Sequence, residues 1–290
     1  MRGTVQRARA RAKPAAAIAA PLSGVELSLR AQLCYARRMH VFVTGASSGI
    51  GEAFAREWHR RGAVLTLVAR RKERLEALAK ELGARVSVIG ADLSKPKLAE
   101  VALDEAERTT GPVDVLVNNA GVQIVAAAHE TDPDEGEALL ELNVATPLRL
   151  IRRALPGMLE RGRGSIVNVA SMAALSPVPA MLYYNASKGA LANASEALRG
   201  ELAGTGVNVL TVYPGPVHTD MGDTAIERYE ATLAAQLAPW GTSAELAELV
   251  VRGVELGRAR IVYPRAYASS LWFPNLSRWL SLKLAPPLKR

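Results

Sequence analysis

The sequence predicts an α/β fold, a single doubly wound domain in which helices cover both faces of a parallel β-sheet. From Met39 onward, short β-branched runs alternate with longer segments of helical spacing. A glycine-rich turn joins the first such run to the first helical segment. Residues 39–290 contain neither an internal repeat nor a linker that would divide them, and this length is sufficient to bury one large core.

The first half of this region alternates four strands with three helices. The strands are nearly continuous apolar runs, typical of a parallel sheet that is buried on both faces. They are His40–Thr44, Val64–Ala69, Arg85–Ala91 and Val113–Asn118. The helices have apolar residues at helical spacing among charged ones. They are Ile50–Arg61, Lys72–Leu82 and Leu98–Arg108.

The second half continues the alternation. Helical spacing extends from Glu137 to Leu159, and we expect a break around Pro147 because proline lacks the N–H that a helix requires. The later helices are Tyr184–Leu202 and Ser243–Leu256. The later strands are Ser165–Ala170, Asn208–Val212 and Ile261–Tyr263. The sequence therefore predicts one catalytic domain over residues 39–265, followed by a C-terminal tail over residues 266–290.

The formal net charge of +8 is concentrated near the N-terminus. Residues 1–38 contain eight Lys and Arg against one Glu, so residues 39–290 are nearly neutral. Aromatic residues do not interleave with the early arginines, and we expect no nucleic-acid partner. We interpret residues 1–38 as a basic extension. It is either a disordered or targeting segment, or the product of a misassigned translation start ahead of Met39.

Cysteine and histidine usage indicates the compartment and the absence of a metal. The single cysteine, Cys34, excludes an internal disulfide and favours a reducing, cytoplasmic location. The four histidines are far apart in the sequence, and none is paired with a cysteine at metal-ligand spacing, so no metal is expected. Every apolar run falls short of the roughly 18 residues that indicate a membrane-spanning helix.

The turn Thr44–Gly51, with the sequence TGASSGIG, is typical of a dinucleotide site. Glycines permit a tight turn and let the backbone approach a pyrophosphate, and the following helix offers free N–H groups to phosphate. The alternative is a purely structural glycine-rich turn. The predicted contacts are Gly45, Ser47, Ser48, Gly49, Ile50 and Gly51.

The end of the second strand indicates which dinucleotide binds. An acidic residue there would favour NAD(H), because it accepts hydrogen bonds from the ribose 2′-hydroxyl. This sequence instead has Ala69 followed by Arg70 and Arg71, and a guanidinium suits a 2′-phosphate. We therefore predict NADP(H) over NAD(H), with Arg70 as the primary contact. The alternative is a solvated basic helix start.

Tyr184 and Lys188 stand four residues apart, which places both side chains on one face of a helix. A fixed ammonium would lower the pKa of a nearby phenol and prepare it for acid–base catalysis. Ser171 follows a strand end, where ligands meet an open parallel sheet, and the segment Asn118–Gly121 follows another.

In combination, these motifs resemble the short-chain dehydrogenase/reductase family over essentially all of residues 39–265. The matched features are TGxxxGxG from Thr44, Asp92-Leu93, Asn118–Gly121, Asn143, Ser171, Tyr184-xxx-Lys188 and Pro214–Thr219. The resemblance implies a Rossmann-type sheet of seven strands in the order 3-2-1-4-5-6-7 and a homodimer or homotetramer built on the helices around Leu148 and Leu191. It also implies further cofactor contacts at Asp92, Leu93, Asn119, Ala120, Gly121, Pro214, Gly215, Val217 and Thr219.

By this resemblance, Asn143, Ser171, Tyr184 and Lys188 form a catalytic tetrad. Tyr184 would exchange a proton with the substrate oxygen, and Ser171 would hydrogen-bond the same oxygen. Lys188 would tune the tyrosine and hold the nicotinamide ribose. Asn143 would kink its helix and position a water. The alternative interpretation is that Asn143 is simply a polar residue on a surface helix.

The segments after the strand ends suggest an apolar substrate. They offer Met172, Leu175, Val178, Met181, Leu182, Met221, Leu237, Pro239 and Trp240, some of which belong to core or interface in the alternative interpretation. Between Pro274 and Pro286 the tail is amphipathic and would cover the pocket, form a subunit interface or lie on a membrane surface, with packing on protein favoured.

The sequence as a whole predicts an NADPH-dependent oxidoreductase acting on the carbonyl or secondary alcohol of a small apolar molecule. The alternative is a catalytically silent NADP(H)-binding regulator or scaffold with the same fold.

Overall fold

The structure is a computed structural model that describes residues 39–289, with side chains except at 234 and 235. The basic extension over residues 1–38 lies outside the described residues. Among residues 39–289, no helix combines the length and the apolarity needed to cross a bilayer.

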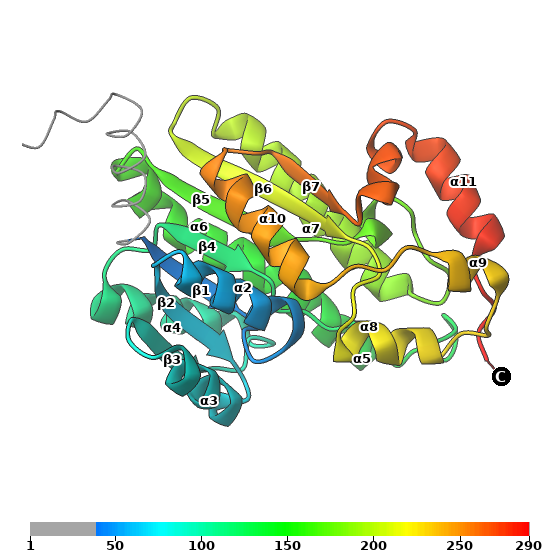
Figure 1. The fold of residues 1–290 in the computed structure, drawn as a ribbon, viewed down its shortest axis with the longest axis horizontal. Helices are drawn as coiled ribbons and strands as arrows, with labels where there is room; N and C mark the ends of the chain where they lie inside the picture. The colour runs from blue at the N-terminus through cyan, green and yellow to red at the C-terminus, as the bar shows by residue number, and fades with distance from the viewer. Residues whose placement is uncertain (1–38, 290) are drawn as a thin grey trace, which may run out of the picture. The chain divides into compact units, whose positions relative to one another are not determined.

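Seven parallel strands form one sheet in the order β3-β2-β1-β4-β5-β6-β7 (Figure 1). Their bounds are β1 His40–Thr44, β2 Val64–Ala69, β3 Val86–Gly90, β4 Val115–Asn118, β5 Gly164–Val169, β6 Val207–Pro214 and β7 Arg260–Tyr263. The chain crosses from β3 to the far side of β1 to form β4, so the strand order reverses between β1 and β4. The structure confirms the predicted fold class and the strand order.

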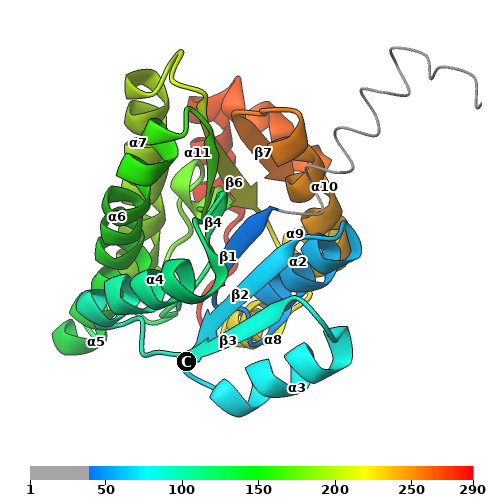
Figure 2. The ribbon, with the colours of Figure 1, turned by 90° about the vertical axis from the view of Figure 1, so that its left-hand side faces the viewer.

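Helices pack on both faces of the sheet, and the alternation of strand side chains supplies a core to each layer (Figure 2). One layer contains α2 Gly49–Arg60, α3 Lys72–Leu82 and α10 Ser243–Glu255. The other contains α4 Pro96–Thr110, α6 Thr146–Glu160 and α7 Leu182–Glu201. Val41 and Val43 of β1 pack in the same core as Trp58, whereas Phe42 points the other way and packs with Leu150.

The expected break around Pro147 is wrong. Helix α5, Pro133–Leu140, continues into α6 through a π-helical turn over Glu141–Ala145. The turn is closed by the Thr146 N–H, which donates to the carbonyl of Glu141 five residues earlier. Because Pro147 follows directly in the first turn of α6, its missing N–H falls where the hydrogen-bond pattern changes, and the helix is not interrupted.

The segment after β6, for which the sequence indicated no helix or strand, contains α8 Asp220–Glu227 and α9 Leu233–Leu237. Helix α8 begins at Thr219, whose Oγ1 accepts a hydrogen bond of 3.1 Å from the Gly222 N–H. The negative charges of Asp220 and Asp223 in the first turn stabilise the helix by interacting with the positive end of its dipole. After β7, the chain forms α11 over Pro274–Leu284.

Candidate active site

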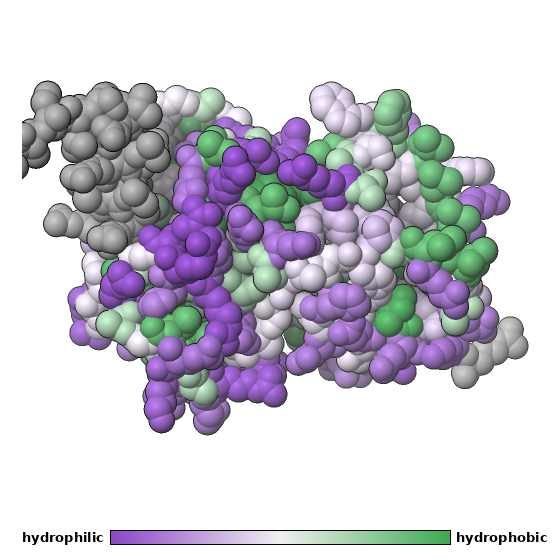
Figure 3. Space-filling model, viewed as in Figure 1, coloured by the Kyte–Doolittle hydropathy of each residue, from purple (hydrophilic) through white to green (hydrophobic). Residues whose placement is uncertain are grey.

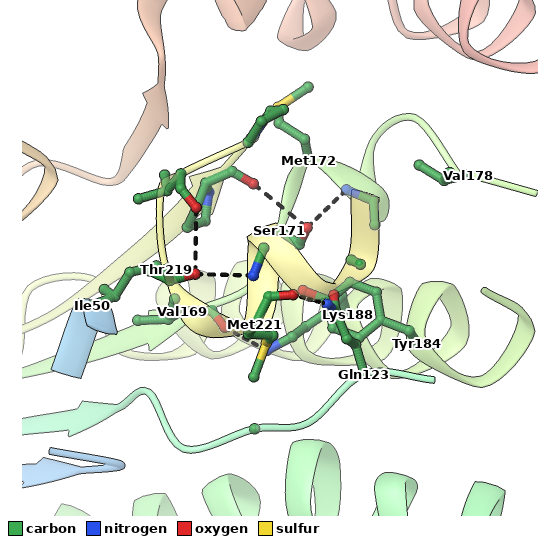
Figure 4. A pocket seen from close by; sticks show the side chains of 18 of the residues that line it. Ile50, Gln123, Val169, Ser171, Met172, Val178, Tyr184, Lys188, Thr219 and Met221 are labelled. Carbon is green, nitrogen blue, oxygen red and sulfur yellow. Dashed lines mark hydrogen bonds between the residues drawn. The ribbon is translucent and has the colours of Figure 1, made fainter. Parts of the chain in front are cut away.

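A cleft of about 1100 Å³ lies at the carboxyl ends of the strands and extends from the glycine turn to α11. Ten of its lining residues are labelled in Figure 4. Every residue that the sequence predicts for catalysis or cofactor binding lines this cleft except Asn143. Strand ends from β1, β2, β4, β5 and β6 therefore converge as the strand pattern predicts.

The turn after β1 leaves a surface bare of side chains. Gly45 and Gly49 have φ of +67° and +58°, which residues with a side chain rarely adopt. A Cβ on Gly51 would lie 2.2 Å from the Gly45 carbonyl oxygen, so only glycine fits where α2 meets the turn. The turn is held to β2 by the Gly45 N–H, which donates to the Val68 carbonyl at 2.8 Å.

Thr44 and Asn119 join the end of β1 to the end of β4 beneath this turn. The Thr44 Oγ1 accepts hydrogen bonds from the N–H groups of Asn119 and Ala120 at 2.9 and 3.0 Å, and donates to the Val117 carbonyl at 3.0 Å. The Asn119 Nδ2 donates to the Thr44 carbonyl at 3.0 Å. Asn119 therefore lines the cleft and also supports the backbone that shapes it.

Two arginines stand at the end of β2, and both are exposed and line the cleft. Arg71, not Arg70, contacts the glycine turn: its Nη2 donates to the Oγ atoms of Ser47 and Ser48 at 3.1 and 2.8 Å. The pKa of Asp92 is lowered chiefly by the hydrogen bond from the Ser94 hydroxyl, and the positive charge of Arg70 contributes. Sequence reasoning ranked Arg70 first and missed the contacts of Arg71.

Ser171 and Tyr184 bring two hydroxyl groups together beside the end of β5. The Ser171 Oγ caps the short helical turn that follows it, accepting from the Ala173 N–H at 3.1 Å, and it also contacts the Pro214 carbonyl at 3.5 Å. Burial raises the pKa of Tyr184, and a hydrogen bond with the Ser171 side chain acts in the opposite direction. The phenol is therefore protonated at neutral pH.

Lys188 lies one turn along α7 from Tyr184, as the spacing predicts. Its Nζ is 5.7 Å from the centre of the Tyr184 ring and donates to the Val169 carbonyl at 2.9 Å (Figure 4). Burial lowers the pKa of Lys188 to about 8. We expected the ammonium to lower the pKa of the phenol, but burial raises the pKa of Tyr184 instead.

Asn143 is buried in the π-helical turn, which excludes its interpretation as a surface residue. Its amide exchanges two hydrogen bonds with the backbone of Val122, at 3.0 Å from the N–H and 2.9 Å to the carbonyl. Its Nδ2 also donates to the Ser187 Oγ at 3.1 Å. Asn143 thus ties the loop after β4 to α7 and supports the cleft from behind Gly121, where an added Cβ would lie 3.0 Å from its Oδ1.

Apolar side chains form the outer half of the cleft. Of the residues expected there, seven line it: Met172, Val178, Met181, Met221, Leu237, Pro239 and Trp240. Two do not, because Leu175 packs against a small core cluster and Leu182 is exposed at the start of α7. Sequence reasoning missed Gln123, whose Nε2 donates to the Met221 carbonyl at 2.6 Å and so connects two sides of the cleft.

The C-terminal tail closes the outer end. The cleft is lined by Phe273, just before α11, and by Leu276, Leu280 and Leu284 within it. Beyond the helix, the tail pairs with the end of α8, where the Glu230 N–H donates to the Pro287 carbonyl and the Lys289 N–H donates to the Arg228 carbonyl, both at 2.9 Å. The sequence left open whether the tail covers the pocket, forms a subunit interface or lies on a membrane, and these contacts support the first of these.

Several known proteins are similar to this chain in sequence and in structure. The family model described as short chain dehydrogenase matches residues 39–230. A fatty acyl-CoA reductase of Mycobacterium tuberculosis is 38% identical over 213 residues, which are 70% of this chain and 72% of the relative.

Two similar solved structures are complexes with a dinucleotide. A short-chain dehydrogenase from Sphingobium yanoikuyae in complex with NADPH is 29% identical, with a TM-score of 0.72 over 84% of this chain and 95% of the other. A short-chain dehydrogenase/reductase from Burkholderia phymatum in complex with NAD is 28% identical, with a TM-score of 0.73 over 87% and 97%. Together with the family match, they show that this chain belongs to the short-chain dehydrogenase/reductase family of oxidoreductases, which use nicotinamide cofactors.

Proposed function

We propose that the protein is an NADPH-dependent oxidoreductase that transfers hydride between the nicotinamide and the carbonyl or secondary alcohol carbon of an apolar substrate. The observation that supports this most directly is the meeting of the Ser171 and Tyr184 hydroxyls in a cleft. On one side of them lies a bare glycine turn and on the other an apolar chamber.

The residues present fit a nicotinamide dinucleotide. The turn from Gly45 to Gly51 forms a cradle that a side chain would fill, and the N-terminus of α2 would offer N–H groups to a pyrophosphate. Asp92, Ala120 and Thr219 line the cleft on either side of this turn and would hold the adenosine and nicotinamide halves. When bound, the nicotinamide supplies or accepts the hydride, and the protein provides position and electrostatics.

The roles of the catalytic residues follow from their protonation and burial. A protonated Tyr184 donates its proton to the carbonyl oxygen during reduction, and Ser171 hydrogen-bonds the same oxygen as negative charge develops there. Lys188 is buried beside the phenol and stabilises the tyrosinate that remains. Asn143 acts as a positioning residue through Val122 and Ser187.

The choice of NADPH over NADH rests on Arg70 and Arg71, and replacing each arginine by alanine tests its contribution separately. Losing one charge-assisted contact to the 2′-phosphate should raise the KM for NADPH at least about tenfold and leave the KM for NADH unchanged. Initial rates of Arg70→Ala, Arg71→Ala and the double variant with both cofactors measure this effect.

Arg74→Ala is the matched control, because Arg74 belongs to the same basic segment but does not line the cleft. If the double variant keeps the wild-type ratio of the two KM values, the NADP(H) assignment is wrong. If only Arg71→Ala changes the ratio, the primary contact moves from Arg70 to Arg71.

Substrate class is tested by NADPH oxidation with aldehydes and ketones of increasing chain length. Because the outer cleft is lined by apolar side chains, kcat/KM should rise with each added methylene by up to about threefold to fourfold. The similarity to a fatty acyl-CoA reductase supports a long apolar substrate. Highest activity on short polar carbonyls would contradict this proposal, and binding of NADPH without any turnover would favour a silent binding protein.

We also infer that the protein forms a homodimer or homotetramer, as the family resemblance implies. Leu148 is exposed on α6 and available for such a contact. Leu191 is buried within the subunit, so α7 would contribute its other residues to an interface.

A further inference from the structure

Helix α11 turns polar side chains toward the protein. The Ser277 hydroxyl bonds the hydroxyls of Ser176 and Ser270, the latter at 2.8 Å. One turn later, the Ser281 Oγ donates to the Pro177 carbonyl at 3.0 Å. A helix on the surface of a soluble domain ordinarily packs its apolar side inward, whereas α11 presents these serines to the protein and only Leu276, Leu280 and Leu284 to the cleft.

The large apolar residues of α11 and its approach remain exposed. Trp272 is 82% exposed, Trp279 55% and Leu282 57%, and Figure 3 shows the hydrophobic colour gathered along this helix. We define these three residues as the α11 patch. The sequence favoured packing of the tail on protein, but these exposures show that residues 39–289 leave the patch uncovered. An exposed patch of this kind marks an interaction site.

The charge around the patch is positive. Arg278 and Lys283 stand within α11 and both are exposed, and the Arg278 Nε also donates to the Leu175 carbonyl at 3.3 Å. The sequence contains no Asp or Glu after Glu255. The segment that pairs with the tail contains two acidic residues, Glu227 at the end of α8 and Glu230 just after it, together with Arg228. Tryptophan next to Lys and Arg, without acidic neighbours on the same helix, is typical of segments that lie at a lipid–water interface.

We propose that the α11 patch docks on an anionic phospholipid bilayer, with Trp272, Trp279 and Leu282 among the acyl chains and Arg278 and Lys283 at the headgroups. A symmetric contact with a second copy is disfavoured, because it would bring like charges of both α11 helices together with no carboxylate on either helix to pair them. The neighbouring face of α11, with Phe273, Leu276 and Leu280, lines the cleft. Docking would therefore set the cleft mouth at the bilayer surface.

The test uses the full chain with vesicles of phosphatidylglycerol or of phosphatidylcholine. Co-sedimentation should favour phosphatidylglycerol and weaken at high salt, because the headgroup contacts are screened. Trp272→Gln/Trp279→Gln should reduce partitioning at least about tenfold through lost apolar burial. A matched pair refines this result: Leu282→Gln should weaken binding, and Leu256→Gln should not, although the two leucines are equally exposed at 57% and 58%.

A second readout separates the patch from the basic residues 1–38, which also favour anionic vesicles. Brominated acyl chains quench only indoles that enter the bilayer, and residues 1–38 contain no tryptophan. Wild-type emission should fall, and emission of the double variant, from Trp58 and Trp240, should not. The proposal is overturned if the wild type sediments without quenching. It is also overturned if the double variant binds like the wild type, or if the patch only mediates self-association in sedimentation velocity.

Discussion

Tyr184→Phe should lower kcat for carbonyl reduction by about 10² to 10⁴-fold, the usual contribution of a general acid. The phenol is protonated because burial raises its pKa, so its proton is available to the substrate oxygen at neutral pH. Phenylalanine retains the ring and its packing but removes the only group that this proposal assigns to proton donation. The dissociation constant for NADPH should change little, and single-turnover kinetics with saturating NADPH would measure the chemical step.

Tyr183→Phe is the control for this experiment. Tyr183 is adjacent in sequence, but its ring packs against Gly136, where an added Cβ would lie 2.3 Å from the Tyr183 Cζ. It does not line the cleft, so the same loss of a hydroxyl should leave kcat unchanged. Equal loss of turnover in both variants, or none at Tyr184, would remove Tyr184 from its assigned role.

The sheet was predictable because most of its strands are buried on both faces, so their sequences are nearly continuous apolar runs. Val64–Ala69 has the same bounds in the sequence analysis and in the structure. The π-helical turn was not predictable, because a proline inside helical spacing signals a break whether or not a wider turn accommodates it. Helix α8 did have a sequence signal, because Thr219 is followed by the acidic residues Asp220 and Asp223, a pattern typical of a helix start. That pattern was missed because only the overall composition of this segment was considered.

The candidate site was predictable where one local segment contains the whole motif. The glycine turn and the pair Tyr184 and Lys188 are of this kind, because spacing along a turn or a helix determines which groups meet. Contacts between segments left no such signal: the reach of Arg71 to Ser47 depends on how the β2 end faces the turn. The direction of the Tyr184 pKa shift also required the structure, because burial depends on neighbours from several elements.

Gly51→Ala should weaken NADPH binding by more than about tenfold and lower the free energy of unfolding by roughly 1–3 kcal/mol, the cost of overpacking. The added Cβ would lie 2.2 Å from the Gly45 carbonyl oxygen and 2.6 Å from the Asn119 Nδ2. The first contact is to backbone, so the turn itself must move. Fluorescence titration with NADPH and urea unfolding of the protein measure the two effects separately.

Gly200→Ala makes the same chemical change in a helix where, apart from the neighbouring backbone of that helix, no atom lies within 4 Å of the added Cβ. It should leave NADPH affinity unchanged and stabilise the protein by roughly 0.5–1 kcal/mol, because alanine favours the helix. If Gly51→Ala loses stability but binds NADPH normally, the close approach of α2 to the turn serves the fold alone. If it binds weakly at wild-type stability, the spacing between Gly51 and Gly45 serves the phosphate cradle directly.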